Sequence, residues 1–136
     1  MSSSANPTAA IIVIGDEILS GRTKDKNIGW LAEQLGAQGI QLGEARVIAD
    51  KKQTIIETVQ TLSKTYDLVF TSGGIGPTHD DITSLSIAKA FDQDLILNEV
   101  AHKILIQHYG AENVNEARLK MAYLPRKASL LDNPIS

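Results

Sequence analysis

A run of six apolar residues, Ala9 to Ile14, constrains the fold of this chain more than any other stretch. Four of the six are β-branched, and Gly15 follows directly. The run lacks the alternation of apolar and polar residues that marks a half-exposed strand, so it predicts a strand buried on both faces. Strands of that kind occur in parallel sheets whose two faces are covered by helices.

The rest of the chain alternates between helical spacing and short apolar runs. Apolar residues three and four apart predict helices over about 28–35, 51–62, 82–91 and 100–108, with a last short helix ending near Met121. Apolar runs predict further strands at 40–48, weakened at Gly43, and at 67–71 and 95–97. The alternation predicts the α/β class, with a mainly parallel sheet between helices and right-handed crossovers.

The composition is that of a single globular domain. The chain has 136 residues, 43% hydrophobic and 21% charged, so we expect a flexible tail at residues 1–8 and one domain over 9–136. No stretch has the roughly 20 apolar residues of a membrane span, and the N-terminus lacks a signal core, so we expect no membrane partner and a cytoplasmic location. The formal net charge is −3 and the basic residues are scattered, which disfavours a nucleic-acid partner. The lack of cysteine excludes disulfides and thiolate metal sites.

A glycine-rich turn, Ser72 to Thr78, follows the strand predicted at 67–71. Backbone amides in such a turn can form an anion-binding concavity, and the N-terminus of the next helix adds a favourable dipole. The turn matches neither the P-loop nor the dinucleotide-binding pattern. Taken alone, it is explained equally well as a tight strand-to-helix connection without a ligand. The residues expected to bind phosphate here are Ser72, Gly73, Gly74, Gly76, Pro77, Thr78 and Thr83.

Acidic residues follow both strong strands. Asp16 and Glu17 come after the first strand, and Asp80 and Asp81 come after the glycine turn. Since function in such sheets gathers beyond the carboxyl ends of the strands, we expect these four side chains to converge and to hold a divalent cation that also contacts the ligand phosphate. The alternatives are an Asp that accepts hydrogen bonds from the ligand, or Asp80 or Asp81 as a helix cap with Glu17 in solvent. Asp50 follows the second strand, where capping is the simpler interpretation.

Two long motifs carry a resemblance to a known family. Residues 14–21 read I-G-D-E-I-L-S-G and are followed by Asp25 and Asn27, and residues 71–83 read T-S-G-G-I-G-P-T-H-D-D-I-T. Both resemble the molybdopterin-binding (MoCF biosynthesis) domain, and their wording is closest to the N-terminal domain of the competence/damage-inducible CinA proteins. The similarity covers nearly the whole chain, including residues 118–125.

The resemblance implies a three-layer α/β/α fold and a molybdopterin or adenine-nucleotide ligand at the glycine turn, with Gly15 and Asn27 among the binding residues. It implies a divalent metal (Mg²⁺, Mn²⁺ or Co²⁺) and matches the acidic positions used for metal and phosphate chemistry to Asp81 and Asp50, which we expect to be catalytic. The metal ligands are expected to be Asp16, Glu17, Asp80 and Asp81. Dimers or trimers are implied as well.

The resemblance leaves three functions open. CinA-type domains are associated with metal-dependent hydrolysis of ADP-ribose and similar pyrophosphates, which is the leading expectation. Relatives such as MogA and the gephyrin G domain adenylylate molybdopterin, which is the first alternative, and a non-catalytic binding fragment is the second. Members of this branch usually continue beyond residues 133–134 with further strands and a Gly-Val-Pro segment, so we expect the C-terminal part of the usual domain to be absent here.

Overall fold

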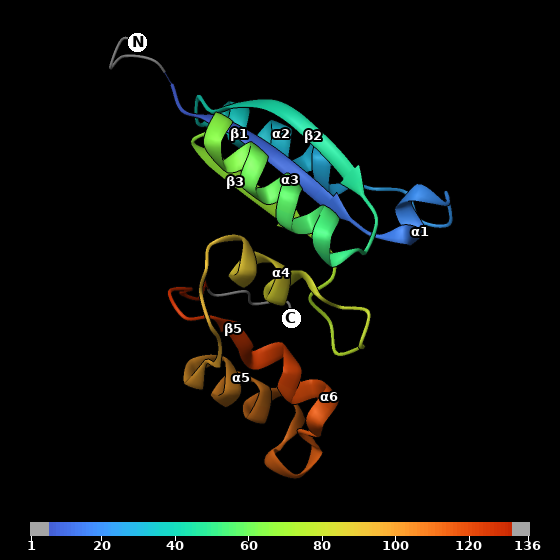
Figure 1. Ribbon diagram of the computed structural model, residues 1–136, viewed down its shortest axis with the longest axis vertical. Coiled ribbons are helices and arrows are strands. Elements are labelled where there is room, and N and C mark those ends of the chain that lie inside the picture. The colour runs from blue at the N-terminus through green and yellow to red at the C-terminus, as the bar shows by residue number, and fades with distance from the viewer. Residues whose placement is uncertain (1–5, 132–136) are drawn as a thin grey trace.

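The centre of the molecule is a three-stranded parallel sheet. The computed structural model describes residues 6–131, and in it β1 (Thr8–Ile14) lies between β2 (Gln41–Ile48) and β3 (Leu68–Ser72). The crossover helices α2 (Asn27–Ala37) and α3 (Lys52–Thr65) lie on opposite faces of the sheet (Figure 1). The predicted α/β/α arrangement is confirmed, with the most apolar strand in the middle.

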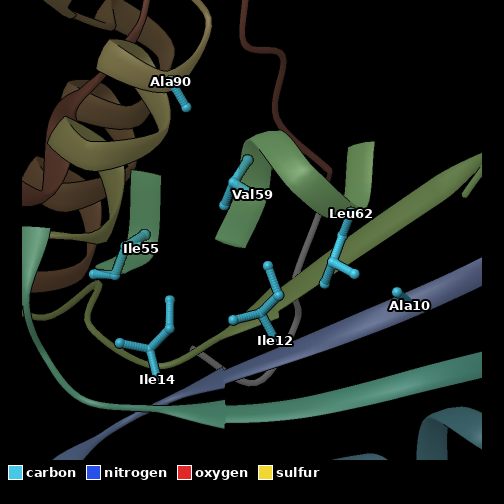
Figure 2. Packing of buried hydrophobic residues seen from close by; sticks show 7 residues of the cluster. All are labelled: Ala10, Ile12, Ile14, Ile55, Val59, Leu62 and Ala90. Atoms are coloured by element: carbon cyan, nitrogen blue, oxygen red, sulfur yellow. The ribbon is translucent and has the colours of Figure 1, made fainter. Parts of the chain in front are cut away.

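The core forms because β1 buries both of its faces. Successive side chains of a strand point to opposite sides, and every residue from Ala9 to Ile14 is buried. Figure 2 shows one face, on which Ile12 and Ile14 point toward α3. The cluster on this face comprises Ala10, Ile12, Ile14, Ile55, Val59, Leu62 and Ala90.

At Gly43, where the sequence predicts that the second strand is weakened, the structure has a β-bulge. Ala9 pairs with Leu42 and Ala10 pairs with Glu44, so Gly43 is left without a partner in β1. A side chain at Gly43 would meet the ring of Tyr66, with a Cβ only 2.8 Å from Tyr66 Cε1. The bulge therefore makes room for an aromatic ring that follows α3.

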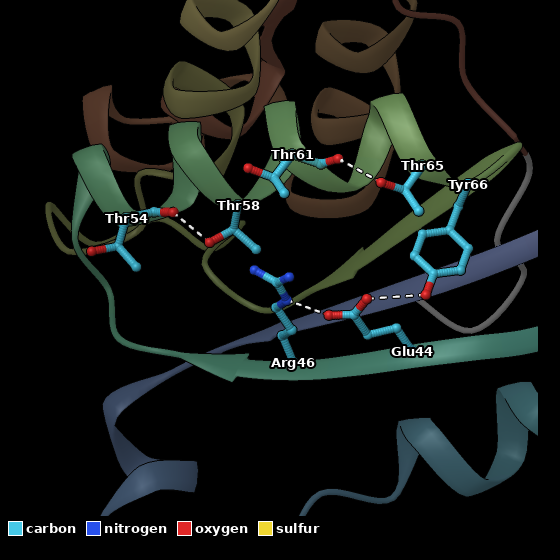
Figure 3. Close-up of polar contacts among 7 residues, drawn as sticks. All are labelled: Glu44, Arg46, Thr54, Thr58, Thr61, Thr65 and Tyr66. Atoms are coloured by element: carbon cyan, nitrogen blue, oxygen red, sulfur yellow. Dashed lines mark hydrogen bonds and ion pairs between the residues drawn. The ribbon is translucent and has the colours of Figure 1, made fainter.

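Polar contacts fix that ring and the face of α3 beside it (Figure 3). The Tyr66 hydroxyl donates to Glu44 Oε1 at 3.0 Å, and Arg46 Nε donates to Glu44 Oε2 at 2.5 Å. Within α3, the hydroxyls of Thr58 and Thr65 donate to carbonyl groups one turn earlier. Glu44 thereby joins β2 to the end of α3.

The second half of the chain builds a smaller layer. It contains α4 (Thr83–Ala90), β4 (Leu95–Leu97), α5 (Glu99–Tyr109), η1 (Ala111–Asn113), α6 (Glu116–Leu119), η2 (Lys120–Ala122) and β5 (Tyr123–Pro125). The strand expected at 95–97 exists, but it pairs antiparallel with β5 in a separate sheet and does not extend the central one. In Figure 1, α4 lies between the central sheet and the rest of this layer.

The N-terminal boundary and one short helix differ from expectation. The first strand begins at Thr8, inside the tail predicted for residues 1–8; its amide and hydroxyl donate to Asp67 Oδ2. Residues 1–5 lie outside the described part of the chain. The four-residue helix α1 (Asp16–Leu19) was not predicted. No helix within residues 6–131 is long and apolar enough to cross a membrane.

Candidate functional site

The glycine turn lies beyond the carboxyl end of β3 and packs against the end of β1. Gly73 and Gly74 have positive φ angles, 98° and 70°, which favour glycine. A Cβ at Gly73 would collide with the carbonyl oxygen of Ile14, and one at Gly74 with the Thr83 hydroxyl. Packing inside the protein is therefore sufficient reason for both glycines.

Thr83 closes the turn from the start of α4. It is buried, its hydroxyl donates to the Gly73 carbonyl at 2.8 Å, and its amide donates to the Gly74 carbonyl at 3.1 Å. The hydroxyl expected to reach a ligand thus supports the turn. Within residues 6–131 the amides of Gly73 and Gly74 donate to no backbone carbonyl of a loop or turn, which makes them candidates for binding an anion.

The second half of the loop is held by Asp81. Its Oδ2 accepts from the Thr78 amide at 2.9 Å and from the Thr78 hydroxyl at 2.7 Å. Partial burial raises the pKa of Asp81, but hydrogen bonds from the Thr78 hydroxyl and from the Thr78 and Gly76 amides outweigh it, helped by the Lys120 charge. The pKa therefore lies below its ordinary value. Asp81 thus accepts hydrogen bonds from the loop that was expected to bind phosphate, and Pro77 is exposed.

Asp16 and Asp50 face each other beside the turn. The Asp16 amide donates to Asp50 Oδ2 at 3.4 Å, and the Asp50 amide donates to Asp16 Oδ1 at 3.2 Å. A Cβ at Gly74 would lie 3.6 Å from Asp50 Oδ1, so this carboxylate faces the glycine turn. Burial, followed by the negative charges of Asp16, Glu17 and Asp81, raises the pKa of Asp50 although the Asp16 amide opposes the shift.

The predicted metal ligands are only partly brought together. Within residues 6–131 no group of three or more His, Asp or Glu residues forms a metal cage. Asp80 is exposed and its Oδ1 lies 3.3 Å from His79 Nε2, while Asp81 is bound to Thr78. Asp16 and Asp50 do fit the usual demand of Mg²⁺, which takes one or two carboxylates and completes its shell with phosphate and water oxygens. Metal binding stays a prediction, and it now includes Asp50, which was expected to be catalytic from the family resemblance but was not among the expected metal ligands.

A cavity of about 370 Å³ opens on the other side of Gly73. Its lining comes from the end of β1, from α1, from residues 23–27 and from Ser72 and Gly73. Asn27, the first residue of α2, donates from Nδ2 to Ser72 Oγ at 2.6 Å, which ties α2 to the end of β3. Asn27, Ser72 and Gly73 are thus in the positions expected of binding residues. Gly15 is hidden beneath Glu17, whose carboxylate a Cβ at Gly15 would overlap.

Comparison with known proteins identifies the family. Residues 10–129 match the family described as "Probable molybdopterin binding domain". The chain belongs to this family. The match includes every residue discussed above as part of the site.

Relatives of this molybdopterin-binding domain include solved structures. It is 34% identical to CinA from Thermoplasma acidophilum, a protein described as having unknown function; the TM-score is 0.90 over 98% of this chain and 79% of that one. MoaB from Pyrococcus furiosus, described as a tungsten cofactor synthesizing protein, is 26% identical, with a TM-score of 0.61 over 82% of this chain and 70% of that one.

One curated relative is named as neither CinA nor MoaB. A Caenorhabditis elegans protein named "Probable FAD synthase" is 47% identical over 139 residues, which cover 91% of this chain and 27% of that protein. The molybdopterin-binding domain described here spans about half the length, or less, of the curated relatives it matches.

Three basic residues of this molybdopterin-binding domain were missed by sequence reasoning. Lys24 and Lys26 line the cavity, and the Lys120 ammonium donates to the Thr78 carbonyl. Lys24 and Lys26 stand in the gap between the motif that ends at Gly21 and Asn27, so their closeness to the motifs was a usable signal. Lys120 is 42 residues from Thr78, and no local pattern marks it.

Proposed function

We propose that the chain binds a phosphorylated nucleotide or pterin in the cavity beside Gly73. The observation that carries this is Gly73, whose amide has no backbone partner within residues 6–131 and which belongs to the lining of an open, partly apolar cavity. Free amides at positive φ bind anionic oxygen, and a cavity of about 370 Å³ is within the range of small-ligand sites.

The activity proposed for this site is hydrolysis of an adenosine pyrophosphate such as ADP-ribose. A divalent cation, held by Asp16 and Asp50, would supply a Lewis acid for the phosphoryl oxygens. Asp50 is also the candidate base, because its carboxylate faces the glycine turn, where the ligand phosphate would lie. Asp81 would hold the loop through Thr78. The name of the Caenorhabditis elegans relative supports adenosine pyrophosphates as a class, since FAD contains one.

Incubation with ADP-ribose or FAD tests the activity. With Mg²⁺, Mn²⁺ or Co²⁺ present, we expect release of AMP, measured by chromatography. Asp50→Asn should lower the rate by about 100-fold or more, because general-base catalysis typically contributes 10²–10⁴-fold. Glu112→Gln, an exposed change in η1, should leave the rate unaltered. No AMP with any of the three metals would reject hydrolysis.

A second candidate function is binding or adenylylation of molybdopterin. The family description and the similarity to MoaB favour it. Calorimetry with ATP and with a pterin monophosphate separates the candidates, because selective pterin binding supports the second. A non-catalytic domain would bind either ligand and gain thermal stability without turnover. Assembly into dimers or trimers is part of the proposal and is tested by light scattering.

A further inference from the structure

Two kinds of charged group lie near the glycine turn. The carboxylates of Asp16 and Asp50 contact each other's amides, and Asp50 faces Gly74. The cavity beside Gly73 has Lys24 and Lys26 in its lining, from the segment between α1 and α2, together with Glu17 and Asp25. A ligand in this cavity therefore has two basic side chains within its lining.

The two lysines are not neutralised by the carboxylates that share the cavity. Neither makes an ion pair within residues 6–131. Asp25 lies between them in the chain, but its Oδ2 accepts from the Ile28 amide at 2.9 Å and so serves the start of α2. Glu17 also lines the cavity, with its carboxylate folded over Gly15. The ammonium groups are thus free to meet an anion.

Part of the lining of the same cavity is apolar. Val13 and Ile18 belong to it, whereas the side chain of Ile14 points toward α3 and is part of the core. Asn27 and Ser72, which are joined by a hydrogen bond, supply polar lining. A ligand with a ring and a charged substituent suits this mixture of apolar, polar and basic lining residues.

We propose that Lys24 and Lys26 form the anion-binding end of this cavity and make it selective for phosphorylated ligands. In this orientation the ring contacts Val13 and Ile18, and the phosphate is bound by the Gly73 amide and the two ammonium groups. This inference rests on the proposed function, because it assigns the orientation of the ligand in that site. It does not depend on hydrolysis or on a metal.

The test compares matched ligands by calorimetry in the absence of divalent metal. The probes are adenosine against AMP, and pterin against a pterin monophosphate. The unmodified chain should bind the phosphorylated member of a pair about 10-fold or more tightly, because charge-assisted hydrogen bonds are the strong ones. The double variant Lys24→Met/Lys26→Met should lose most of this preference and still bind the unphosphorylated ring within about twofold of the original affinity.

Two further variants make the result specific. Lys64→Met/Lys103→Met removes the same charge at exposed positions of α3 and α5 and should keep the phosphate preference. Lys24→Arg/Lys26→Arg retains the charge and should keep it too. Raising the salt concentration should weaken AMP binding by the unmodified chain more than by the Lys24→Met/Lys26→Met variant.

The two proposals fail in distinguishable ways. If the unmodified chain prefers phosphorylated ligands and Lys24→Met/Lys26→Met prefers them equally, the role of the lysines is overturned while the binding function stands. If the unmodified chain binds none of the four probes, the binding function is rejected and this orientation with it. Equal loss of preference in the Lys64→Met/Lys103→Met control would also overturn the assignment, since net charge alone would then explain the effect.

Discussion

Asp50 is the residue of the site whose surroundings disfavour its negative charge. Its carboxylate is half-buried and has three acidic neighbours, and the pKa is raised as a result. A raised pKa means that the folded state binds more protons at this position than the unfolded chain. The contribution of Asp50 to the stability of the fold therefore falls as the pH rises through the ordinary pKa of an aspartate and toward the raised pKa of the folded state. A site that tolerates such repulsion is suited to a cation.

The variant Asp50→Asn should show how much the charge repulsion at this position costs in stability, independently of its effect on activity. The melting temperature should be unchanged or higher at pH 7, because a negative charge leaves an acidic cluster. The difference from the unmodified chain should grow as the pH rises above the ordinary aspartate pKa of about 3.9, because ionisation of Asp50 costs more in the folded state than in the unfolded chain. Calorimetric melting at several pH values measures it. A melting temperature lower at pH 7 than at pH 4, relative to the unmodified chain, would contradict the assigned repulsion.

The glycine turn illustrates how far residue patterns reach. The sequence correctly places Gly73 and Gly74 after a strand and before a helix, but a glycine required by a ligand and one required by packing look identical in sequence. Here Gly73 approaches the backbone of Ile14 and Gly74 approaches Thr83. Ile14 is far from Gly73 along the chain, and the loop has to fold back to bring Thr83 to Gly74, so only the fold reveals that packing already explains both glycines. The presence of the two glycines is therefore no evidence for a ligand, and the proposed binding rests on the backbone amides of the turn.

At the scale of elements, β1 organises the whole sheet. It pairs with both other strands, and Ile12 in its middle is fully buried against α3. Ile12→Ala should lower the free energy of unfolding by about 2–5 kcal/mol, because it removes buried methyl groups and leaves a cavity. Urea denaturation measures it. Val100→Ala in α5, where the side chain is 59% exposed, serves as the control and should cost well under about 1 kcal/mol. Similar losses at both positions would contradict this account of the core.

Glu44 directly follows the bulge in β2, and two side chains donate hydrogen bonds to its carboxylate. Its pKa is lowered first by the hydrogen bond from Arg46 and then by that from the Tyr66 hydroxyl (Figure 3). Tyr66→Phe should raise the pKa of Glu44 partway toward the ordinary value, and Arg46→Met should raise it further. Carbon-detected NMR titration of the carboxylate measures both shifts. An unaltered titration in Tyr66→Phe would show that the tyrosine does not contact Glu44 in solution.

Elements that bury a long, regular pattern were predictable, whereas short non-local pairs were not. The strand at 9–14 and the helices carrying Leu35 and Val59 each have a clear period, and their positions are confirmed. By contrast, β5 has three residues and ends in Pro125, and its partner Leu95 lies far back in the chain. Neither its length nor its composition distinguishes it from a loop. The helix α1 has four residues, too few for a periodic signal.

At the scale of the molecule, the segment η2 near the C-terminal end contacts the loop of the site through Lys120. The Lys120 ammonium in η2 donates to the Thr78 carbonyl, and its charge helps to lower the pKa of Asp81. Thr78 and Asp81 are bound to each other in the same loop. The loop over residues 76–81 is therefore held from within by Asp81 and from the C-terminal layer by Lys120. Removing either contact should make the loop more mobile and leave the packing of the hydrophobic core unaltered.

Lys120→Met should loosen the loop and raise the pKa of Asp81. The folded pKa of Asp81 lies below its unfolded value, so ionised Asp81 stabilises the fold above the unfolded pKa of about 3.9, and this stabilisation is lost as the pH falls through the folded pKa. Without Lys120 the loss should begin at a higher pH, and the Thr78 amide should exchange with solvent faster. NMR titration and hydrogen exchange measure the two effects. Lys127→Met removes an exposed lysine whose backbone amide alone makes a hydrogen bond, to Gln93, and should change neither. If Lys120→Met leaves both the Asp81 titration and the Thr78 exchange unaltered, the C-terminal layer does not hold the loop, and the site is then a property of the central sheet and its own loops.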